Sequence, residues 1–296
     1  MSRLYDCVIV GGGPGGLTAA TYLARYRRHC LVFDTGQARA AWIPKSHNCP
    51  GFPDGVGGPE LLARMRDQAR GFGVEAIDAE VTALHRNDDG FHIRHGEASV
   101  RARNVILATG CEDVMPSLEK LEDAVACGAV RLCPICDAYE AIDRSIAVYG
   151  PPAKNASHAR FLRTYSHRVA LVPSEPCDDA DLREALARDD VELTAEATAL
   201  HFDGKRCTFD LGGQPRSFDV LYPMLGLISR SSLAVGAGAR CDDEGALIVD
   251  PRQMTSVDGL YAIGDVVSAL NQISVATGHA AIAATDVHNR LSRNYA

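Results

Sequence analysis

The sequence predicts an α/β protein with two Rossmann-like domains. The same order of apolar strand, glycine-containing turn and helix begins at two places, Gly11 and Gly150. Strands that alternate with helices favour a parallel sheet with helices packed on it. The length of 296 residues also fits two domains, since about 150 residues per domain is a usual size.

The first cycle of elements is the clearest. An apolar strand is expected at residues 6–10, a helix at 17–26 and a second strand at 29–33. Together they form a βαβ unit of about thirty residues. Residues 37–58 are rich in Pro, Gly and Asn and predict a loop, and a helix is expected at 59–72.

The later elements follow from the same patterns. Short alternating segments between residues 75 and 102 favour an antiparallel meander. Apolar strands are expected at 105–108, 145–149, 169–172, 221–225 and 259–263, strand-like runs near Leu193 and Phe209, and helices at 153–165 and 274–291.

Composition and charge exclude several classes of protein. A net charge of −8 and a pI of about 5.7 argue against a nucleic-acid partner. No apolar run approaches the ~20 residues of a membrane span. The chain begins at Met1 and enters a strand directly, without the regions of a signal peptide, so we expect a cytoplasmic protein. Isolated cysteines such as Cys7 and Cys30 are then expected to be small buried hydrophobic residues.

The first glycine turn predicts a dinucleotide site. Gly11, Gly13 and Gly16 have the spacing in which the glycines allow a tight turn, the approach of a pyrophosphate and close packing of helix on strand. The free N–H groups at the start of the following helix favour phosphate binding. Asp34, 23 residues after Gly11, is placed to accept hydrogen bonds from a ribose.

Two cysteines are close in sequence, in Cys133-Pro134-Ile135-Cys136. Thiols at this spacing can close a small disulfide, and this placement often lowers the pKa of one thiol. One alternative is half of a zinc site, which would need a second pair of ligands, whereas the other cysteines are scattered singly. A second alternative is an inert pair. We therefore expect a redox-active pair and no metal.

These motifs together resemble a known family. Residues 105–110 and 259–265 resemble the second and third FAD fingerprints of flavoproteins with two dinucleotide-binding domains. The segment Cys133–Asp137, just before the second glycine turn, resembles bacterial low-molecular-weight thioredoxin reductase. Residues 48–53 and 272–276 resemble further segments of that family, so the resemblance runs along essentially the whole chain.

The resemblance implies a fold of three-layer ββα type and FAD as a cofactor. It implies a discontinuous FAD domain at residues 1–113 and 245–296, and a degenerate NAD(P)H-type domain at 114–244 that carries the cysteine pair. It also implies a homodimer. The FAD-binding residues carried over are Gly11, Gly13, Gly16, Asp34, Thr109, Gly110, Gly264, Asp265, Gln272 and Ile273. The helix beginning near Ser274 would aim its positive end at the flavin.

The same resemblance implies roles for three residues. Cys136 would be the thiol nearest the flavin, and Cys133 would exchange with the external dithiol or disulfide. Asp137 would transfer the thiol proton, which requires that burial raise the pKa of its carboxyl group. The alternative for Asp137 is a charge at a helix N-terminus. For Cys49, in a segment that lies near the flavin in the family, we expect a structural role.

The second glycine turn departs from the family pattern. Gly150 is present, but the next two glycine positions are Pro152 and Asn155. Pro152 lacks the N–H that would donate to a pyrophosphate. Residues 172–176 contain Glu175 and no basic residue that could bind the 2′-phosphate of NADPH. The sequence therefore predicts poor use of NAD(P)H.

Several interpretations of the electron flow stay open. The protein could be a reductase that receives electrons from a ferredoxin-like donor, or a dithiol oxidase that passes electrons to O2. It could also use NADH or NADPH weakly through Lys154. A non-catalytic flavin redox sensor is a further class. In the catalytic cases the expected partner is a thioredoxin-like protein or a small dithiol or disulfide.

Overall fold

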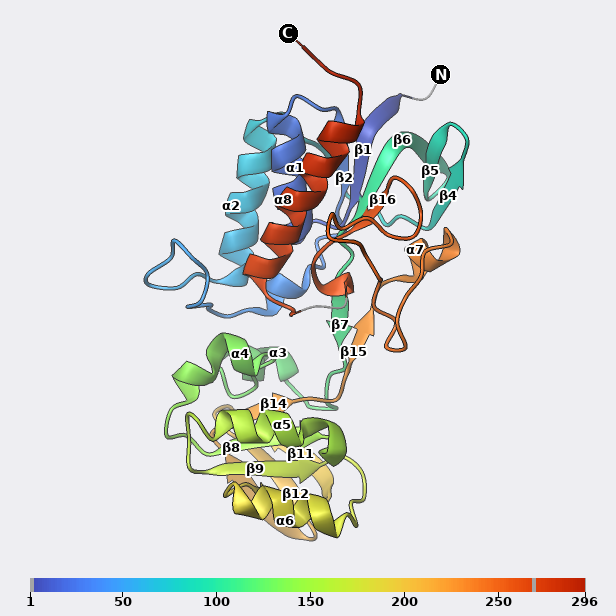
Figure 1. Ribbon diagram of the computed structural model, residues 1–296. Coiled ribbons are helices and arrows are strands. Elements are labelled where there is room, and N and C mark those ends of the chain that lie inside the picture. The colour runs from blue at the N-terminus through green and yellow to red at the C-terminus, as the bar shows by residue number, and fades with distance from the viewer. Residues whose placement is uncertain (1–2, 268–269, 296) are drawn as a thin grey trace. The chain divides into compact units, whose positions relative to one another are not determined.

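The computed structural model describes residues 3–267 and 270–295. Residues 1–2, which belong to the segment used above to argue against a signal peptide, lie outside the described part. The chain divides into two compact units (Figure 1). One unit comprises Met1–Ala41, Gly57–Glu112 and Ile228–Ala296, and the other comprises Trp42–Val56 and Asp113–Leu227.

This division differs from the predicted domains in two places. The first unit resumes at Ile228 rather than at residue 245, because Ala234 and Ala239 belong to the same hydrophobic cluster as Leu247. Residues 42–56 belong to the second unit, where Trp42 packs against a buried cluster that includes Phe209. Neither packing contact has a local signal in the sequence.

The first unit contains a mixed sheet with the strand order β3-β2-β1-β6-β5-β4, and β16 pairs with β6. Its strands are β1 (Leu4–Val10), β2 (Cys30–Phe33), β3 (Glu75–Ile77), β4 (Ala83–Asn87), β5 (Gly90–His95), β6 (Ala98–Leu107) and β16 (Leu260–Ala262). The pairs β1–β2, β1–β6, β2–β3 and β6–β16 are parallel. The predicted meander is present as antiparallel β4–β5–β6, but β3 lies outside it.

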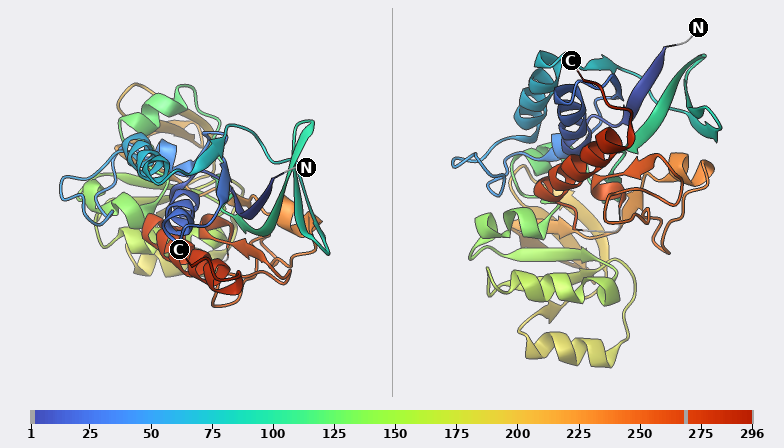
Figure 2. Two further views of the ribbon diagram at one scale, coloured as in Figure 1. Left: turned by 90° about the horizontal axis from the view of Figure 1, so that it is seen from above. Right: turned by 45° about the horizontal axis from the view of Figure 1, so that its top comes forward.

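Helices cover one face of this sheet. They are α1 (Pro14–Arg25), α2 (Gly58–Gly71) and α8 (Ile273–Arg290), and both views show them side by side (Figures 1 and 2). Alternation along β1 directs Cys7 and Ile9 towards the helices. Small residues such as Ala20 and Ala284 let α1 and α8 pack closely. Cys7 and Cys30 are buried here, which confirms their predicted place in the core.

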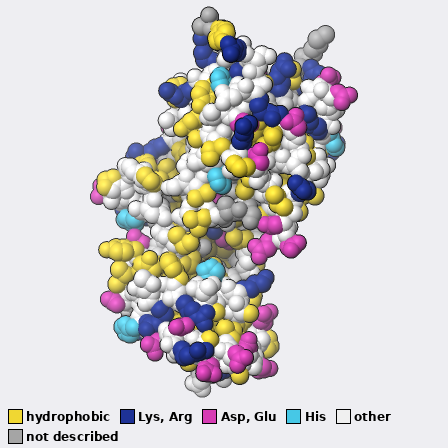
Figure 3. Space-filling model, in the orientation of Figure 1, with side chains coloured by type: hydrophobic (Ala, Val, Ile, Leu, Met, Phe, Trp, Pro, Cys, Tyr) yellow, Lys and Arg dark blue, Asp and Glu magenta, His cyan; other side chains and the backbone are white. Residues whose placement is uncertain are grey.

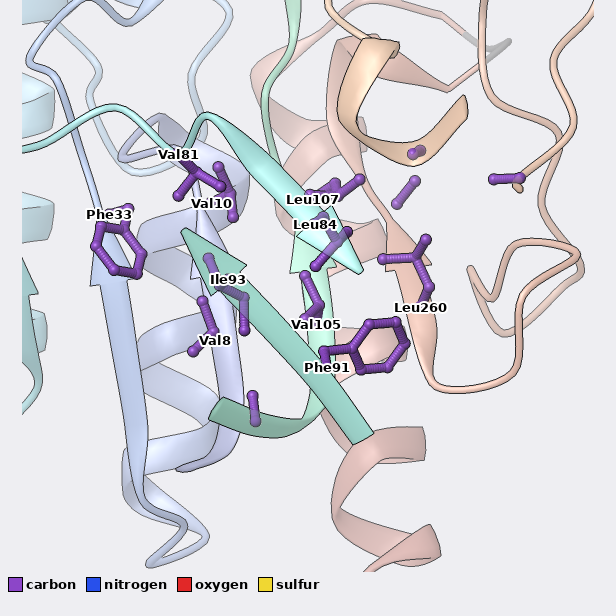
Figure 4. Packing of buried hydrophobic residues seen from close by; sticks show 14 of the residues in the cluster. Val8, Val10, Phe33, Val81, Leu84, Phe91, Ile93, Val105, Leu107 and Leu260 are labelled. Atoms are coloured by element: carbon purple, nitrogen blue, oxygen red, sulfur yellow. The ribbon is translucent and has the colours of Figure 1, made fainter. Parts of the chain in front are cut away.

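The antiparallel strands β5 and β4, which continue the sheet beyond β6, pack over the opposite face of its parallel strands (Figure 4). Val8 and Val10 of β1 meet Leu84 of β4 and Ile93 of β5, and Phe33 closes one side of the cluster. The unit is therefore layered as helices, parallel strands and antiparallel strands. This arrangement confirms the predicted three-layer ββα type.

The second unit repeats the plan with a smaller parallel sheet, in the order β10-β9-β8-β14. Its elements are β8 (Ile146–Gly150), α5 (Pro152–Leu162), β9 (Val169–Pro173), α6 (Ala180–Arg188), β10 (Glu192–Leu193) and β14 (Val220–Pro223). An antiparallel sheet is formed by β11 (Ala197–Phe202), β12 (Cys207–Leu211) and β13 (Gln214–Phe218). Short helices are α3 (Leu121–Ala126), α4 (Pro134–Asp137) and η2 (Ala138–Ala141).

The remaining elements include β7 (Cys111–Asp113) and β15 (Leu227–Ser229), which pair where the chain passes from one unit to the other. The first unit also holds α7 (Ser232–Gly236) and η3 (Gly264–Val266), while η1 (Arg39–Trp42) ends at the first residue of the second unit. Helix α6 was not predicted, although Asp179 caps it by accepting a hydrogen bond from the Leu182 N–H at 2.9 Å.

On the face drawn in Figure 3, acidic and basic side chains are interspersed. Among the helices of the described residues, none has both the length and the apolar character needed to cross a bilayer.

We expect Tyr261→Phe to lower the stability of the first unit. Tyr261 is fully buried, and its hydroxyl donates to Asp286 Oδ2 at 2.6 Å. Loss of that donor from a buried carboxylate costs about 1–3 kcal/mol, so the urea midpoint should fall. Tyr22→Phe, on a ring that is 39% exposed, is the control and should change stability by less than about 0.5 kcal/mol. Equal midpoints for the two variants would contradict the assigned contact.

Candidate functional site

The glycine turn of the first unit is built by close contact between helix and strand. Gly11 has a φ of +113°, and a Cβ there would lie 2.2 Å from the carbonyl oxygen of Ala108. A Cβ on Gly16 would lie 1.9 Å from the carbonyl oxygen of Gly11. Both positions therefore require glycine for the reason that the sequence motif predicts.

Gly13 differs from its neighbours because the space beside it is open. It caps α1 with a φ of −77°, a conformation open to any residue, and the nearest atom to a Cβ would be Ala38 Cβ at 3.8 Å. The first turn of a helix leaves N–H groups without partners inside the helix. Open space next to such donors fits a pyrophosphate.

Asp34 lies against this turn. A Cβ on Gly12 would come within 2.0 Å of the Asp34 carboxyl group. One carboxylate oxygen accepts from the Gly36 N–H at 2.9 Å, and the other accepts from Arg66 Nε at 3.1 Å. The ion pair with Arg66 was not anticipated, because Arg66 lies on α2, far away in sequence. A ribose hydroxyl would share the carboxylate with Arg66.

Thr109 and Gly110 follow β6, next to the glycine turn. The Thr109 hydroxyl donates to the carbonyl oxygen of Arg230 at 2.7 Å, and Gly110 accepts from the Arg230 N–H at 3.0 Å. Gly110 has a φ of +68°, which favours glycine. These two hydrogen bonds connect Thr109 and Gly110 to Arg230, close to where the chain re-enters the first unit. Their predicted contact with FAD stays a prediction.

The predicted FAD segment at residues 259–265 and the start of α8 also lie against the glycine turn of the first unit. A Cβ on Gly15 would lie 3.5 Å from Ile263 Cδ1 and 3.4 Å from the carbonyl oxygen of Ala276 in α8. Gly264, with a φ of +71°, leads to Asp265. Gln272 caps α8, and Ile273 is its first residue. The segments predicted to bind FAD therefore converge on one turn.

Arg39 is a site residue that the sequence did not reveal. It lies on η1, and its guanidinium pairs with Asp265 Oδ2 at 3.3 Å. Both side chains are largely buried, at 24% and 20% exposed. The neighbouring Ala38 is the residue closest to Gly13. This places a cation beside the proposed phosphate site. Its only sequence signal was a position in the loop after Asp34.

Cys133 and Cys136 form a disulfide with a Cα–Cα distance of 5.3 Å, as expected. Cys133 caps α4, and its sulfur accepts a hydrogen bond from the Cys136 N–H at 3.2 Å. Pro134 occupies the first helical position, where its missing N–H is not needed. In the part of the chain that the structure describes, no cluster of three potential metal ligands occurs.

Asp137 follows the pair and is 20% exposed. Burial raises the pKa of its carboxyl group, which confirms the predicted direction. The Arg131 guanidinium at 3.2 Å and the Tyr222 hydroxyl at 2.9 Å act against burial and lower that pKa. Neither partner was identified from the sequence.

The second glycine turn is closed by its own side chains. Pro151 caps α5 and Pro152 is its first residue. Asn155 is 3% exposed and donates from Nδ2 to the carbonyl oxygens of Met224 at 2.8 Å and Pro151 at 3.1 Å. A buried amide therefore stands at the offset that Gly16 holds in the first turn. Glu175 is exposed after β9.

Cys49 lies in the second unit and is partly buried. Burial raises the pKa of its thiol, which disfavours the reactive thiolate. This is compatible with the structural role expected for it.

Comparisons with known proteins agree with this architecture. The model of the pyridine nucleotide-disulphide oxidoreductase family matches residues 5–280. The thioredoxin reductase of Mycolicibacterium smegmatis is 31% identical over 304 residues, which cover 98% of this chain and 97% of the relative. That of Streptomyces clavuligerus is 30% identical over 309 residues, 99% of this chain and 95% of the relative. The thioredoxin reductase structure from Streptococcus pyogenes has a TM-score of 0.87 at 26% identity and covers 98% of each chain.

The chain therefore belongs to the pyridine nucleotide-disulphide oxidoreductase family. It is an FAD-dependent disulfide oxidoreductase of the thioredoxin reductase-like kind, as the sequence predicts.

Gly13→Ala should weaken FAD binding without unfolding the protein. Its methyl group would enter open space in a compatible backbone conformation, so the stability of the FAD-free protein should change by less than about 0.5 kcal/mol. The same methyl group would occupy the space that we assign to the pyrophosphate, and FAD affinity should fall roughly tenfold or more. Flavin fluorescence titration and thermal unfolding of the FAD-free protein measure the two effects.

Two further variants bracket this result. Gly16→Ala should destabilise the FAD-free protein, since its methyl group meets the Gly11 carbonyl oxygen. Gly71→Ala, at a glycine of α2 with nothing within 4 Å of the added Cβ, should leave FAD affinity unchanged. Unchanged affinity in Gly13→Ala would show that the pyrophosphate lies elsewhere.

Proposed function

We propose that the protein exchanges two electrons between a dithiol or disulfide substrate and FAD through the Cys133–Cys136 pair. The observation that carries the proposal is the disulfide at α4, directly followed by the mostly buried carboxyl group of Asp137. FAD supplies a two-electron carrier when it is bound. The first unit, with open space at Gly13 and Arg39 beside it, is the part that we assign to FAD.

We assign different roles to Cys133, Cys136 and Asp137. Cys133 exchanges with the substrate, and Cys136 is the sulfur that communicates with FAD. A substrate dithiol that reduces the pair loses two electrons and two protons, while the Cys133–Cys136 bond breaks and a disulfide forms in the substrate. Asp137 holds or releases a proton at the sulfur of Cys136, which its raised pKa supports.

We further propose that NADPH is a poor electron donor, and three features of the second unit support this. Asn155 occupies the position where a glycine would let helix and strand pack closely, and Pro151 and Pro152 remove two N–H donors from the turn. Glu175, beyond β9, would repel a 2′-phosphate. The first turn, in contrast, keeps all three glycines and the open space at Gly13.

The proposed partner is a thioredoxin-like protein or a small dithiol or disulfide, since the relatives are thioredoxin reductases. A ferredoxin-like protein would serve as donor if the flow runs towards the substrate. We propose a homodimer in the cytoplasm, and buried thiols such as Cys7, Cys30 and Cys207 are compatible with a reducing compartment.

The cysteine pair should carry the electrons from thiols. Under anaerobic conditions dithiothreitol should bleach the flavin absorbance of the wild-type protein. Cys133→Ser and Cys136→Ser should each slow this bleaching at least about a hundredfold, since one thiol cannot complete the exchange. Cys127→Ser, at an exposed thiol of the same unit, is the matched control. The pair would be structural if both single variants bleached like the wild type.

NADPH should reduce the protein much more slowly than dithiothreitol at matched millimolar concentrations in anaerobic stopped-flow measurements. One lost charge-assisted hydrogen bond costs about 1.5–3 kcal/mol, or roughly ten- to a hundredfold in affinity, and the missing basic cluster adds to this loss. Pro152→Gly alone should not restore NADPH use, since Asn155 still fills the turn. Fast, saturable bleaching by micromolar NADPH would overturn this part of the proposal.

A further inference from the structure

Tyr222 is a fully buried residue with a polar contact that packing alone does not require. It lies in β14, among the apolar residues of the core beneath α5. Its hydroxyl donates to Asp137 Oδ1 at 2.9 Å. A phenylalanine would fill the same apolar space, so the hydroxyl group serves the carboxylate.

Arg131 holds the second oxygen of the same carboxylate. Its guanidinium lies 3.2 Å from Asp137 Oδ2 and also donates to the carbonyl oxygen of Asp137 at 3.4 Å. The Arg131 N–H donates to the carbonyl oxygen of Leu221 at 2.9 Å, and Val130 forms a bridge with Leu221. Arg131 is thus bound through its backbone to Leu221, the residue next to Tyr222 in β14.

We propose that Tyr222 and Arg131 are positioning residues that fix the orientation of the Asp137 carboxyl group and set how readily it gives up its proton during thiol–disulfide exchange. This inference rests on the proposed function. It goes beyond it by assigning a task to two residues outside the cysteine motif.

The electrostatics of the site support this assignment. Burial raises the pKa of Asp137 and Glu140 of η2 adds to that, whereas Arg131 and Tyr222 lower it. Among the described residues, these are the charged and titratable groups that shift the pKa of this carboxyl group. Removing the Tyr222 hydroxyl takes away a donor to the carboxylate, so the proton is held more tightly and the pKa rises further.

The exchange step balances as follows. A substrate thiolate bonds to the sulfur of Cys133, the Cys133–Cys136 bond breaks, and Cys136 leaves with the electron pair and accepts the proton of Asp137. The second substrate thiol then displaces Cys133 as a thiolate, and its proton restores the carboxylic acid of Asp137. The substrate is oxidised by two electrons and the cysteine pair is reduced by two.

The test uses the FAD-loaded protein and dithiothreitol. The initial rate of formation of oxidised dithiothreitol is measured in anaerobic, acid-quenched samples across a pH series and divided by the thiolate concentration. This rate should fall as the pH rises through the pKa of Asp137, because the acid form supplies the proton. Asp137→Asn should abolish this fall.

Tyr222→Phe should move the midpoint of the fall upward by about one pH unit, the size expected for one hydrogen bond to a charged group. Arg131→Gln should move it upward as well, and Arg131→Lys, which keeps the charge, should restore part of the shift. The matched control is Tyr149→Phe in β8, whose ring packs against Phe209, and it should leave the midpoint unchanged.

A second measurement does not depend on turnover. The infrared band of the protonated carboxyl group, identified by its loss in Asp137→Asn, should titrate with the same upward shift in Tyr222→Phe. An unchanged midpoint in both measurements would overturn the positioning role and leave the proposed function standing. If the wild type does not oxidise dithiothreitol through the pair, the proposed function fails and this inference fails with it.

Discussion

The first unit depends on the approach of α1 to the end of β1. Any residue other than glycine at position 16 would place its Cβ against the carbonyl oxygen of Gly11. This contact seats the helix start at the edge of the parallel strands. The segments after β6, after β16 and before α8 then meet at one point. The FAD site that we propose, made from four stretches of chain, depends on this one steric condition.

The second unit has the same strand–turn–helix arrangement, but a different contact joins its helix to its strands. Here the helix start meets the strand ends through a side-chain amide, because Asn155 bonds the carbonyl oxygens on both sides of the turn. Buried carbonyl groups are costly when they lack donors, so this amide stabilises the turn. The similarity of the two folds therefore does not imply similar ligands. Binding depends on what fills the turn.

The sequence was most informative where a residue is constrained by its own neighbours. The glycines at 11 and 16, the cysteine pair and the buried strands were all predicted, since spacing and periodicity encode them. The pairs Asp34–Arg66 and Arg39–Asp265 join segments that only the folded chain brings together. For the same reason the contacts of Asp137 with Arg131 and Tyr222 could not be predicted from single-sequence patterns, even though Asp137 itself was.

The self-filled turn at Asn155 has a consequence for the life of the protein in a cell. With FAD in the first unit, as we propose, that unit gains stability in proportion to the logarithm of the FAD concentration, because FAD binds the folded form. The second turn is ordered by its own amide, and under the proposed poor binding of NADPH it would gain little such support. When flavin supply falls, the two units therefore lose protection unequally. Degradation would begin in the flavin-binding unit, and the abundance of the whole protein would follow the flavin status of the cell.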